Sequence, residues 1–100
     1  MNETDKCMLV LNLTPELEDS LVDYLLSQPG VEGFTSYPVR GHGDDDSLTV
    51  AEQVRGQRKR LQFELMLPAA AIDALLEGLA GAVGTGIVFH VQPVLRKGRI

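Results

Sequence analysis

The chain has no tryptophan, one cysteine and two histidines among its 100 residues. Its lone cysteine, Cys7, cannot form an internal disulfide, and the sequence contains no CxxC motif or Cys/His array of the kind that holds zinc. No apolar run approaches the roughly 18 residues of a membrane-spanning helix. The first seven residues, MNETDKC, are polar and acidic, unlike a signal peptide. We therefore expect a cytoplasmic protein that does not insert into a membrane.

Basic residues are also in the minority. Nine Lys and Arg stand against 14 Asp and Glu, and the resulting net charge of −5 argues against general affinity for nucleic acids or anionic membranes. No serine or cysteine has a histidine in a recognisable catalytic motif, so we do not expect an enzyme. The length and the apolar fraction of 44% are typical of a single globular domain covering residues 1–100.

Short apolar runs alternate with helical patterns along the chain. Thr14-Pro15-Glu16 is typical of a helix start, and Pro29-Gly30 ends that helix. Pro68 opens a second helix, and the glycines from 78 to 86 are expected to fray its end into a turn. The helices are expected to bury Leu17, Leu21, Val22, Leu25 and Leu26, and then Ile72, Leu75, Leu76 and Leu79. Strands are predicted over residues 7–13, 33–41, 61–67 and 86–95. In the second strand one face is predicted to carry Thr35, Tyr37 and Val39, and in the third the core face is predicted to carry Leu61, Phe63, Leu65 and Leu67.

This order predicts an α+β fold, the ferredoxin-like βαββαβ sandwich with a long loop between its second and third strands. Two helices can cover only one face of a four-stranded sheet. The positions expected on the other face are too apolar for a face in full contact with water, so we expect self-association through the sheet. These positions are Met8, Val10, Met66, Val88 and His90.

The predicted loop, residues 41–60, is long for a compact domain of this size. Gly41 and Gly43 permit a sharp exit from the strand on either side of His42. Within the loop, Thr49-Val50-Ala51-Glu52 fits a capping box that begins a short helix. Its apolar side, with the arginine that follows, is predicted to contact a partner through Leu48, Val50, Val54 and Arg55.

Several groups leave two interpretations open. His42 with Asp44, Asp45 and Asp46 is either a site for a copper- or zinc-type ion or a turn histidine beside solvated aspartates. The basic cluster from Arg55 to Arg60 either receives an anion or forms a solvated edge. Cys7 is a soft metal ligand or a small buried hydrophobe, and His90 is a ligand or a packed strand residue.

Two stretches resemble the PII signalling proteins. GVEGFTSYPVRGHG, residues 30–43, resembles their second strand and the start of their T-loop, and GTGIVFHV, residues 84–91, resembles their B-loop and last strand. The order of elements agrees over the whole chain. The closest resemblance is to a small PII-like group whose genes commonly lie beside heavy-metal efflux pumps of the resistance-nodulation-division type.

The resemblance implies a homotrimer with effector clefts between subunits and with residues 41–60 as the T-loop equivalent. PII proteins bind adenine nucleotides in those clefts and offer the T-loop to a transporter or enzyme. Three positions depart from the PII pattern: Asp45 replaces the T-loop glutamine, Val54 the modifiable tyrosine, and Ile87 the B-loop lysine that meets phosphates. The implied effector-binding residues are Gly41, His42, Gly43, Arg58, Gly84, Gly86, Arg96 and Arg99.

These observations lead to one principal hypothesis and two alternatives. The principal hypothesis is a trimeric PII-like regulator that senses a nucleotide or metal and modulates a transporter, in heavy-metal efflux, through its 41–60 loop. The first alternative is a metal-binding accessory protein for a divalent or cuprous ion, using His42 and the neighbouring aspartates. The second is a structural adaptor that binds a partner protein and no small ligand.

Overall fold

A computed structural model describes residues 5–42 and 57–100. The predicted loop helix, its partner-binding residues Leu48, Val50, Val54 and Arg55, Gly43, and the aspartates Asp44, Asp45 and Asp46 lie outside the described residues. The elements are β1 (Lys6–Leu13), a 3-10 turn η1 (Pro15–Leu17), α1 (Glu18–Leu26), β2 (Phe34–His42), β3 (Gln57–Pro68), α3 (Ala69–Ala82) and β4 (Val88–Pro93).

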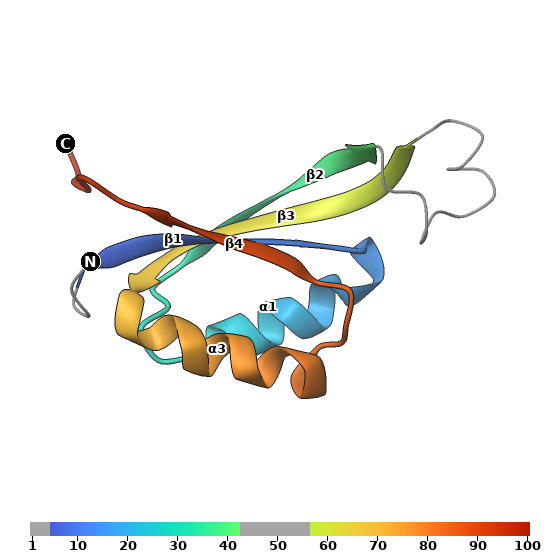
Figure 1. The fold of residues 1–100 in the computed structure, drawn as a ribbon, viewed down its shortest axis with the longest axis horizontal. Helices are drawn as coiled ribbons and strands as arrows, with labels where there is room; N and C mark the ends of the chain where they lie inside the picture. Colours follow the sequence, from blue (N-terminus) through green and yellow to red (C-terminus); the bar gives the residue numbers. More distant parts are fainter. Residues whose placement is uncertain (1–4, 43–56) are drawn as a thin grey trace.

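The four strands form one sheet in the order β2-β3-β1-β4, with every neighbouring pair antiparallel. Both helices lie on the same side of this sheet (Figure 1). The arrangement confirms the predicted ferredoxin-like α+β fold. It also leaves the second face of the sheet without a helix, so that the fold has a covered face and an open face.

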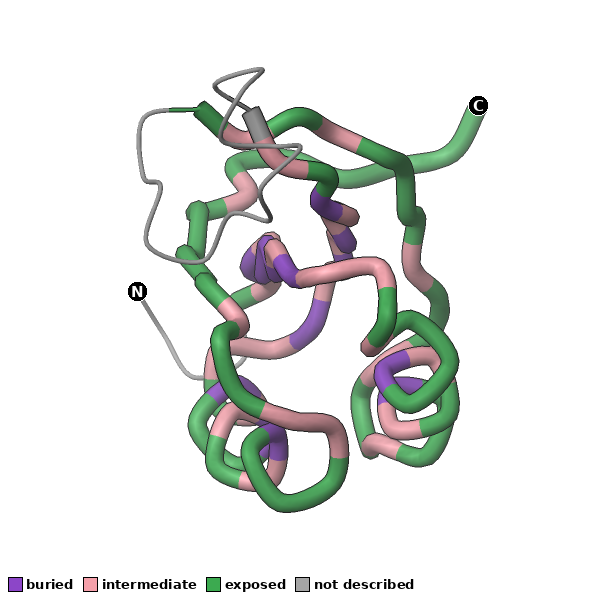
Figure 2. The backbone as a smooth tube through the Cα atoms, turned by 90° about the vertical axis from the view of Figure 1, so that its right-hand side faces the viewer, coloured by how far each residue is buried: buried purple, intermediate pink, exposed green. Residues whose placement is uncertain are grey.

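The core lies between the helices and the covered face, where the buried positions gather in Figure 2. The alternation predicted for β3 is confirmed, because Phe63, Leu65 and Leu67 are buried and Leu61 packs against the same cluster. The strand β1 contributes Cys7, Leu9, Leu11 and Leu13, and the helices contribute Leu21, Leu25, Ile72, Leu75 and Leu79. Cys7 is thus a buried hydrophobic residue of the core.

The first helix differs from its prediction at both ends. Thr14 makes no side-chain capping bond, and Pro15 opens a 3-10 turn, so that α1 itself begins at Glu18. Leu26 was expected on the buried stripe, but it is 71% exposed. Successive residues of an α-helix are rotated by about 100° around its axis. Leu26 directly follows the buried Leu25 and therefore points away from the core.

The glycines of the second helix were expected to fray it, and this prediction is wrong for Gly78 and Gly81, since α3 continues to Ala82. Gly78 makes room for Tyr24 of α1, whose hydroxyl donates to the Leu75 carbonyl at 2.7 Å. The turn lies further along, where Gly84 (φ 149°) and Gly86 (φ 78°) adopt positive φ.

The loop between β2 and β3 is shorter than predicted. Residues 41–42 and 57–60 were assigned to it, but they are paired in the β2–β3 ladder, in which Gly41 lies opposite Arg58. Antiparallel backbone pairing needs no apolar alternation, so the sequence pattern could not reveal this extension of the strands. Among the described residues, no helix is long and apolar enough to cross a membrane.

The contact between Gly78 and Tyr24 gives a stability prediction. A Cβ at residue 78 would collide with the Tyr24 hydroxyl, so we expect Gly78→Ala to lower the free energy of unfolding by about 1–3 kcal/mol, the usual cost of overpacking. The matched control is Gly81→Ala in the same helix, where an added Cβ meets nothing within 4 Å. The control is expected to be neutral or stabilising by up to about 1 kcal/mol in urea unfolding. Equal destabilisation by both variants would contradict this account.

Candidate functional site: the open face and the glycine turn

The strand register determines which side chains share the open face. One row across the sheet contains Thr35, Glu64, Val10 and His90, and the next contains Tyr37, Gln62, Asn12 and Val88. Thr35, Tyr37 and Val39 lie on one face of β2, as predicted. His90 lies on the face opposite the helices, also as predicted. Val10 is buried although no helix covers it.

A chain of hydrogen bonds joins the polar side chains of the open face. Asn12 Nδ2 donates to Gln62 Oε1 at 3.4 Å, and Gln62 Nε2 donates to the Tyr37 hydroxyl at 2.9 Å. The Tyr37 hydroxyl in turn donates to Glu64 Oε2. Strands β1, β3 and β2 are therefore linked by side chains as well as by their backbone ladders.

This series of hydrogen bonds affects the pKa of the Tyr37 hydroxyl. The hydrogen bond to the Glu64 carboxylate raises the pKa of Tyr37 above its ordinary value of 10.0, with a smaller contribution in the same direction from burial. The bond from Gln62 to the phenol oxygen acts in the opposite direction. Tyr37 is therefore a neutral donor on this face over the physiological pH range.

Arg60 extends the network to the turn that precedes β4. Its side chain is 4% exposed, and its Nε donates to Asn12 Oδ1 at 2.6 Å. Its Nη2 donates to two carbonyls, that of Asn12 at 2.9 Å and that of Gly86 at 3.2 Å. A buried guanidinium is tolerated only when its donors are bonded. Arg60 thus connects β3 to the end of β1 and to the glycine turn.

The same arginine lies beside the end of the β2–β3 hairpin. A Cβ added to Gly41 would lie 3.0 Å from both Cγ and Nε of Arg58 and 3.5 Å from Cγ of Arg60. Gly41 therefore leaves room for two arginine side chains. Two of the predicted effector-binding residues, Gly41 and Arg58, are brought together here, and Arg60 joins them to a third, Gly86.

Gly84 and Gly86 line a pocket of about 270 Å³ between the end of α3 and the start of β4. The remaining lining residues are mostly apolar: Leu76, Leu79, Ala80, Thr85, Ile87 and Phe89. We call it the turn pocket. None of its lining residues is charged, and Ile87 is among them at the position that corresponds to the PII B-loop lysine. The pocket therefore suits an apolar group better than a phosphate.

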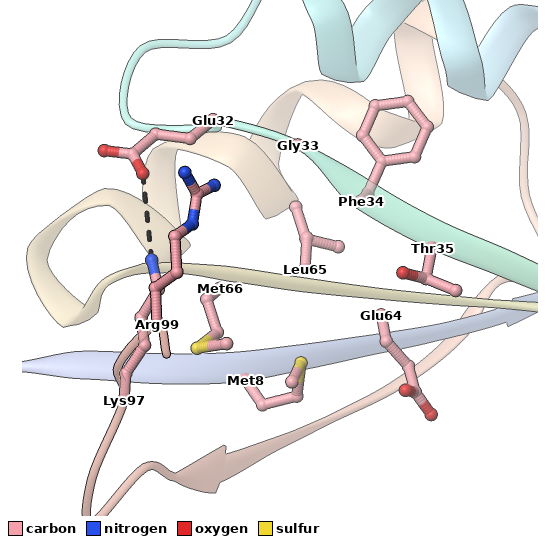
Figure 3. A pocket seen from close by; sticks show the side chains of 10 residues that line it. All are labelled: Met8, Glu32, Gly33, Phe34, Thr35, Glu64, Leu65, Met66, Lys97 and Arg99. Carbon is pink, nitrogen blue, oxygen red and sulfur yellow. Dashed lines mark ion pairs between the residues drawn. The ribbon is translucent and has the colours of Figure 1, made fainter.

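The C-terminal arginines lie elsewhere. Arg99 and Lys97 line a second pocket, of about 360 Å³, beside Met8, Met66 and Glu64 of the open face (Figure 3). Lys97 forms an ion pair with Glu32 at 3.8 Å. Arg96 is exposed and lines neither pocket. Within one chain the predicted effector-binding residues thus fall into three places: the hairpin end, the turn pocket and the C-terminal segment.

The predicted metal site is only partly within the described residues. His42 ends β2, and the aspartates that were to join it lie outside the described chain. Residues 5–42 and 57–100 contain no group of three His, Cys, Asp or Glu side chains placed to hold a metal ion. His90 lies 3.0 Å from Gln92, nitrogen to nitrogen, on the exposed strand β4.

Sequence reasoning included Arg60 only as part of a basic cluster and did not single out Asn12, Gln62 or Tyr37. Alternation with Leu61 and Phe63 does place Arg60 and Gln62 on the open face. The burial of Arg60, however, depends on Asn12 and Gly86, which lie 48 and 26 residues away along the chain. No local pattern could have predicted that burial.

Comparison with known proteins identifies the family. The sequence pattern of DUF3240, described as a protein of unknown function, matches residues 3–100. The chain belongs to the DUF3240 family. The crystal structure of a DUF3240 protein from Shewanella baltica is 26% identical to this DUF3240 chain, with a TM-score of 0.79, covering 100% of this chain and 99% of that one. No curated protein matches the sequence.

A second solved structure is similar in fold alone. A Bacillus cereus protein related to NIF3 is 13% identical with a TM-score of 0.70, and the match covers 98% of this chain. It covers only 28% of the Bacillus cereus chain, so the DUF3240 fold here corresponds to one part of a much longer protein.

The Arg60 network gives a second stability prediction. Arg60→Met removes three partly buried hydrogen bonds from a charged donor, so we expect a loss of about 3 kcal/mol in the free energy of unfolding. The control, Arg40→Met, changes an exposed arginine of β2 and is expected to stay within about 0.5 kcal/mol. Urea unfolding at one protein concentration measures both. Similar losses in the two variants would overturn the assignment.

The Tyr37–Glu64 bond predicts a pH dependence. Because the folded state holds the Tyr37 proton more tightly, the bond's contribution to stability is complete below the ordinary pKa and is lost as pH rises through the folded pKa. In a Tyr24→Phe background, ultraviolet titration should show the pKa of Tyr37 falling towards 10.0 in Glu64→Gln. Glu32→Gln is the control and should leave that pKa unchanged. An unchanged Tyr37 pKa in Glu64→Gln would refute the contact.

Proposed function

We propose that this chain is a non-enzymatic, PII-like regulatory protein that works as a homotrimer. It senses a small effector and, through the segment between β2 and β3, modulates a membrane transporter. The fold and the family membership fit this proposal, although the DUF3240 description names no activity. The resemblance of residues 30–43 and 84–91 to PII sequences supplies the regulatory class.

The observation that carries the proposal is the bridge made by Arg60. In a regulator of this kind, the binding of an effector must change the loop that contacts the partner. Arg60 is well placed to transmit such a change, because it lies in β3 only a few residues after the segment 43–56. Its side chain contacts the carbonyl of Gly86 at the turn pocket and lies beside Gly41 at the hairpin end. An occupant of the glycine turn would shift this carbonyl, and the guanidinium would carry the change to the hairpin.

Trimer formation is supported by the composition of the open face. Met8 and Met66 lie opposite each other in the β1–β3 register, and Val88 adds an apolar side chain that is 58% exposed. Apolar exposure of this kind on an uncovered sheet is typical of an interface between subunits. The side chains of Asn12, Gln62, Tyr37 and Glu64 could be covered by another subunit at a lower cost than unpaired polar groups, because they are already hydrogen-bonded to one another.

The identity of the transporter rests on resemblance. The PII-like group that the sequence resembles is encoded beside heavy-metal efflux pumps, and we propose such a pump as the partner. The effector would be an adenine nucleotide or a metal ion. Because the turn pocket is apolar, we expect it to hold a part of the effector other than a phosphate. Arg58, beside Gly41 at the hairpin end, is the cation that we expect to contact the effector.

The experiment combines light scattering with a thermal-shift screen of the full chain. Light scattering at micromolar concentration should give the mass of a trimer. ATP, ADP, AMP, cyclic nucleotides, Zn²⁺ and Cu⁺ are each titrated, and a true effector should raise the melting temperature in a concentration-dependent way. At one hundred times its Kd, the effector should add about 2.7 kcal/mol to the free energy of unfolding. A monomer would contradict the proposal. A trimer with no response to any of these ligands would contradict the sensing role and favour the structural adaptor.

Two variants separate nucleotide from metal sensing. Arg60→Lys keeps the positive charge but loses the guanidinium group that bonds to both Asn12 and Gly86. If these bonds transmit the effect of the nucleotide, the thermal shift that the nucleotide produces should be smaller in this variant. His42→Ala should abolish a metal response if the metal-binding accessory role is correct, and His90→Ala serves as its histidine control. A metal response that survives His42→Ala would exclude that site.

A further inference from the structure

The second pocket, of about 360 Å³, lies on the open face where the C-terminal segment passes the start of β2. We call it the open-face pocket. Its floor is formed by Met8 and Met66, which lie opposite each other in the β1–β3 register. It shares no lining residue with the turn pocket. The two pockets are therefore separate places for a ligand.

The open-face pocket has a positive end and a negative end. Lys97 and Arg99 lie at one end and Glu64 at the other, with the two methionines between them (Figure 3). Lys97 is paired with Glu32 at 3.8 Å. Arg99 forms no hydrogen bond or ion pair with any residue that the structure describes. Arg99 therefore supplies the unbalanced positive charge at its end of the pocket.

The negative end is held in place by its neighbours. Glu64 Oε2 accepts hydrogen bonds from the Tyr37 hydroxyl and, at 3.4 Å, from Gln62 Nε2. Within residues 5–42 and 57–100, Glu64 Oε1 accepts no hydrogen bond. A carboxylate that is already oriented loses little conformational entropy when it binds a cation. Glu64 Oε1 is thus available to accept a hydrogen bond from a positively charged group of a ligand.

The floor between the two ends is apolar and adaptable. Met8 and Met66 are half-buried, and methionine side chains adjust their shape to a neighbouring group more easily than branched ones do. An aliphatic chain that packs on this floor is removed from water on one side, which stabilises the complex. A ligand that matches the whole pocket therefore has an acidic group, an aliphatic chain and a basic group.

We infer that the open-face pocket binds a small amino carboxylic acid. The ligand's carboxylate bonds to the Arg99 guanidinium, whose parallel N–H donors suit the two oxygens of a carboxylate. Its ammonium group donates to Glu64 Oε1, and its aliphatic chain lies across Met8 and Met66. The inference goes beyond the proposed function, because this ligand is separate from the effector at the turn pocket. Every lining residue belongs to one chain, so the site does not depend on the proposed trimer.

Isothermal titration calorimetry of the full chain tests the inference. The probes are ω-amino acids of increasing chain length, from β-alanine to ε-aminocaproate, each compared with the carboxylic acid and the amine of the same chain. At the chain length that fits best, the amino acid should bind roughly tenfold more tightly than either partner compound, because only it makes both charge-assisted hydrogen bonds. Equal affinity within every set, or no binding of any ω-amino acid at millimolar concentration, would overturn the inference.

Two variants assign the two ends of the pocket. Arg99→Gln should reduce the affinity for the amino acid to that for the amine and leave the amine unaffected. Glu64→Gln should reduce it to the affinity for the carboxylic acid and leave that acid unaffected. The matched control is Arg96→Gln, since Arg96 is an exposed arginine of the same segment that does not line the pocket. A loss in Arg96→Gln as large as in Arg99→Gln would contradict the assignment.

The results distinguish this inference from the proposed function. The comparison of ligands uses the unaltered chain, so it remains decisive if a variant does not fold. A trimer that responds to a nucleotide but binds no ω-amino acid would overturn only the open-face site. A monomer that binds the ω-amino acid as expected would overturn the proposed function and support the site.

Discussion

The whole arrangement depends on how two helices meet a four-stranded sheet. Helices α1 and α3 bury the covered face, with Phe63, Leu65 and Leu75 at its centre, and they leave the other face to side chains alone. The polar groups of an uncovered sheet face can bond to water or to one another. Here the polar side chains bond to one another, from Arg60 through Asn12 and Gln62 to Tyr37 and Glu64.

Arg60 connects this network of the open face to the residues of the candidate site. Its guanidinium is buried by partners from β1 and from the turn before β4, so the hairpin that carries the predicted regulatory segment is tied to the turn pocket. The same pocket has Ile87 where the PII resemblance implies a cation for phosphate. The DUF3240 chain thus has a ferredoxin-like arrangement of elements and, at this turn, no charged residue among those that line the pocket.

Charge is segregated along the chain in a way that supports assembly. No Lys or Arg occurs from residue 7 to 39 or from 61 to 95, so the helices carry only acidic charge, while the basic residues gather in and near the hairpin and in the C-terminal segment. In the proposed trimer, this separation would allow unlike charges to face each other across an interface.

The sequence by itself determined the order of elements, the ferredoxin-like class and the core face of β3, because the periods of helix and strand are local properties that apolar residues report directly. It was less informative at the ends of elements: it placed the glycine-rich end of α3 too early because it could not show Tyr24 over Gly78. Only the tertiary structure decided that Arg60 is buried and bonded to Gly86 and that Gly41 accommodates two arginines. Each of these depends on residues distant in sequence, whose meeting is fixed by strand register and packing.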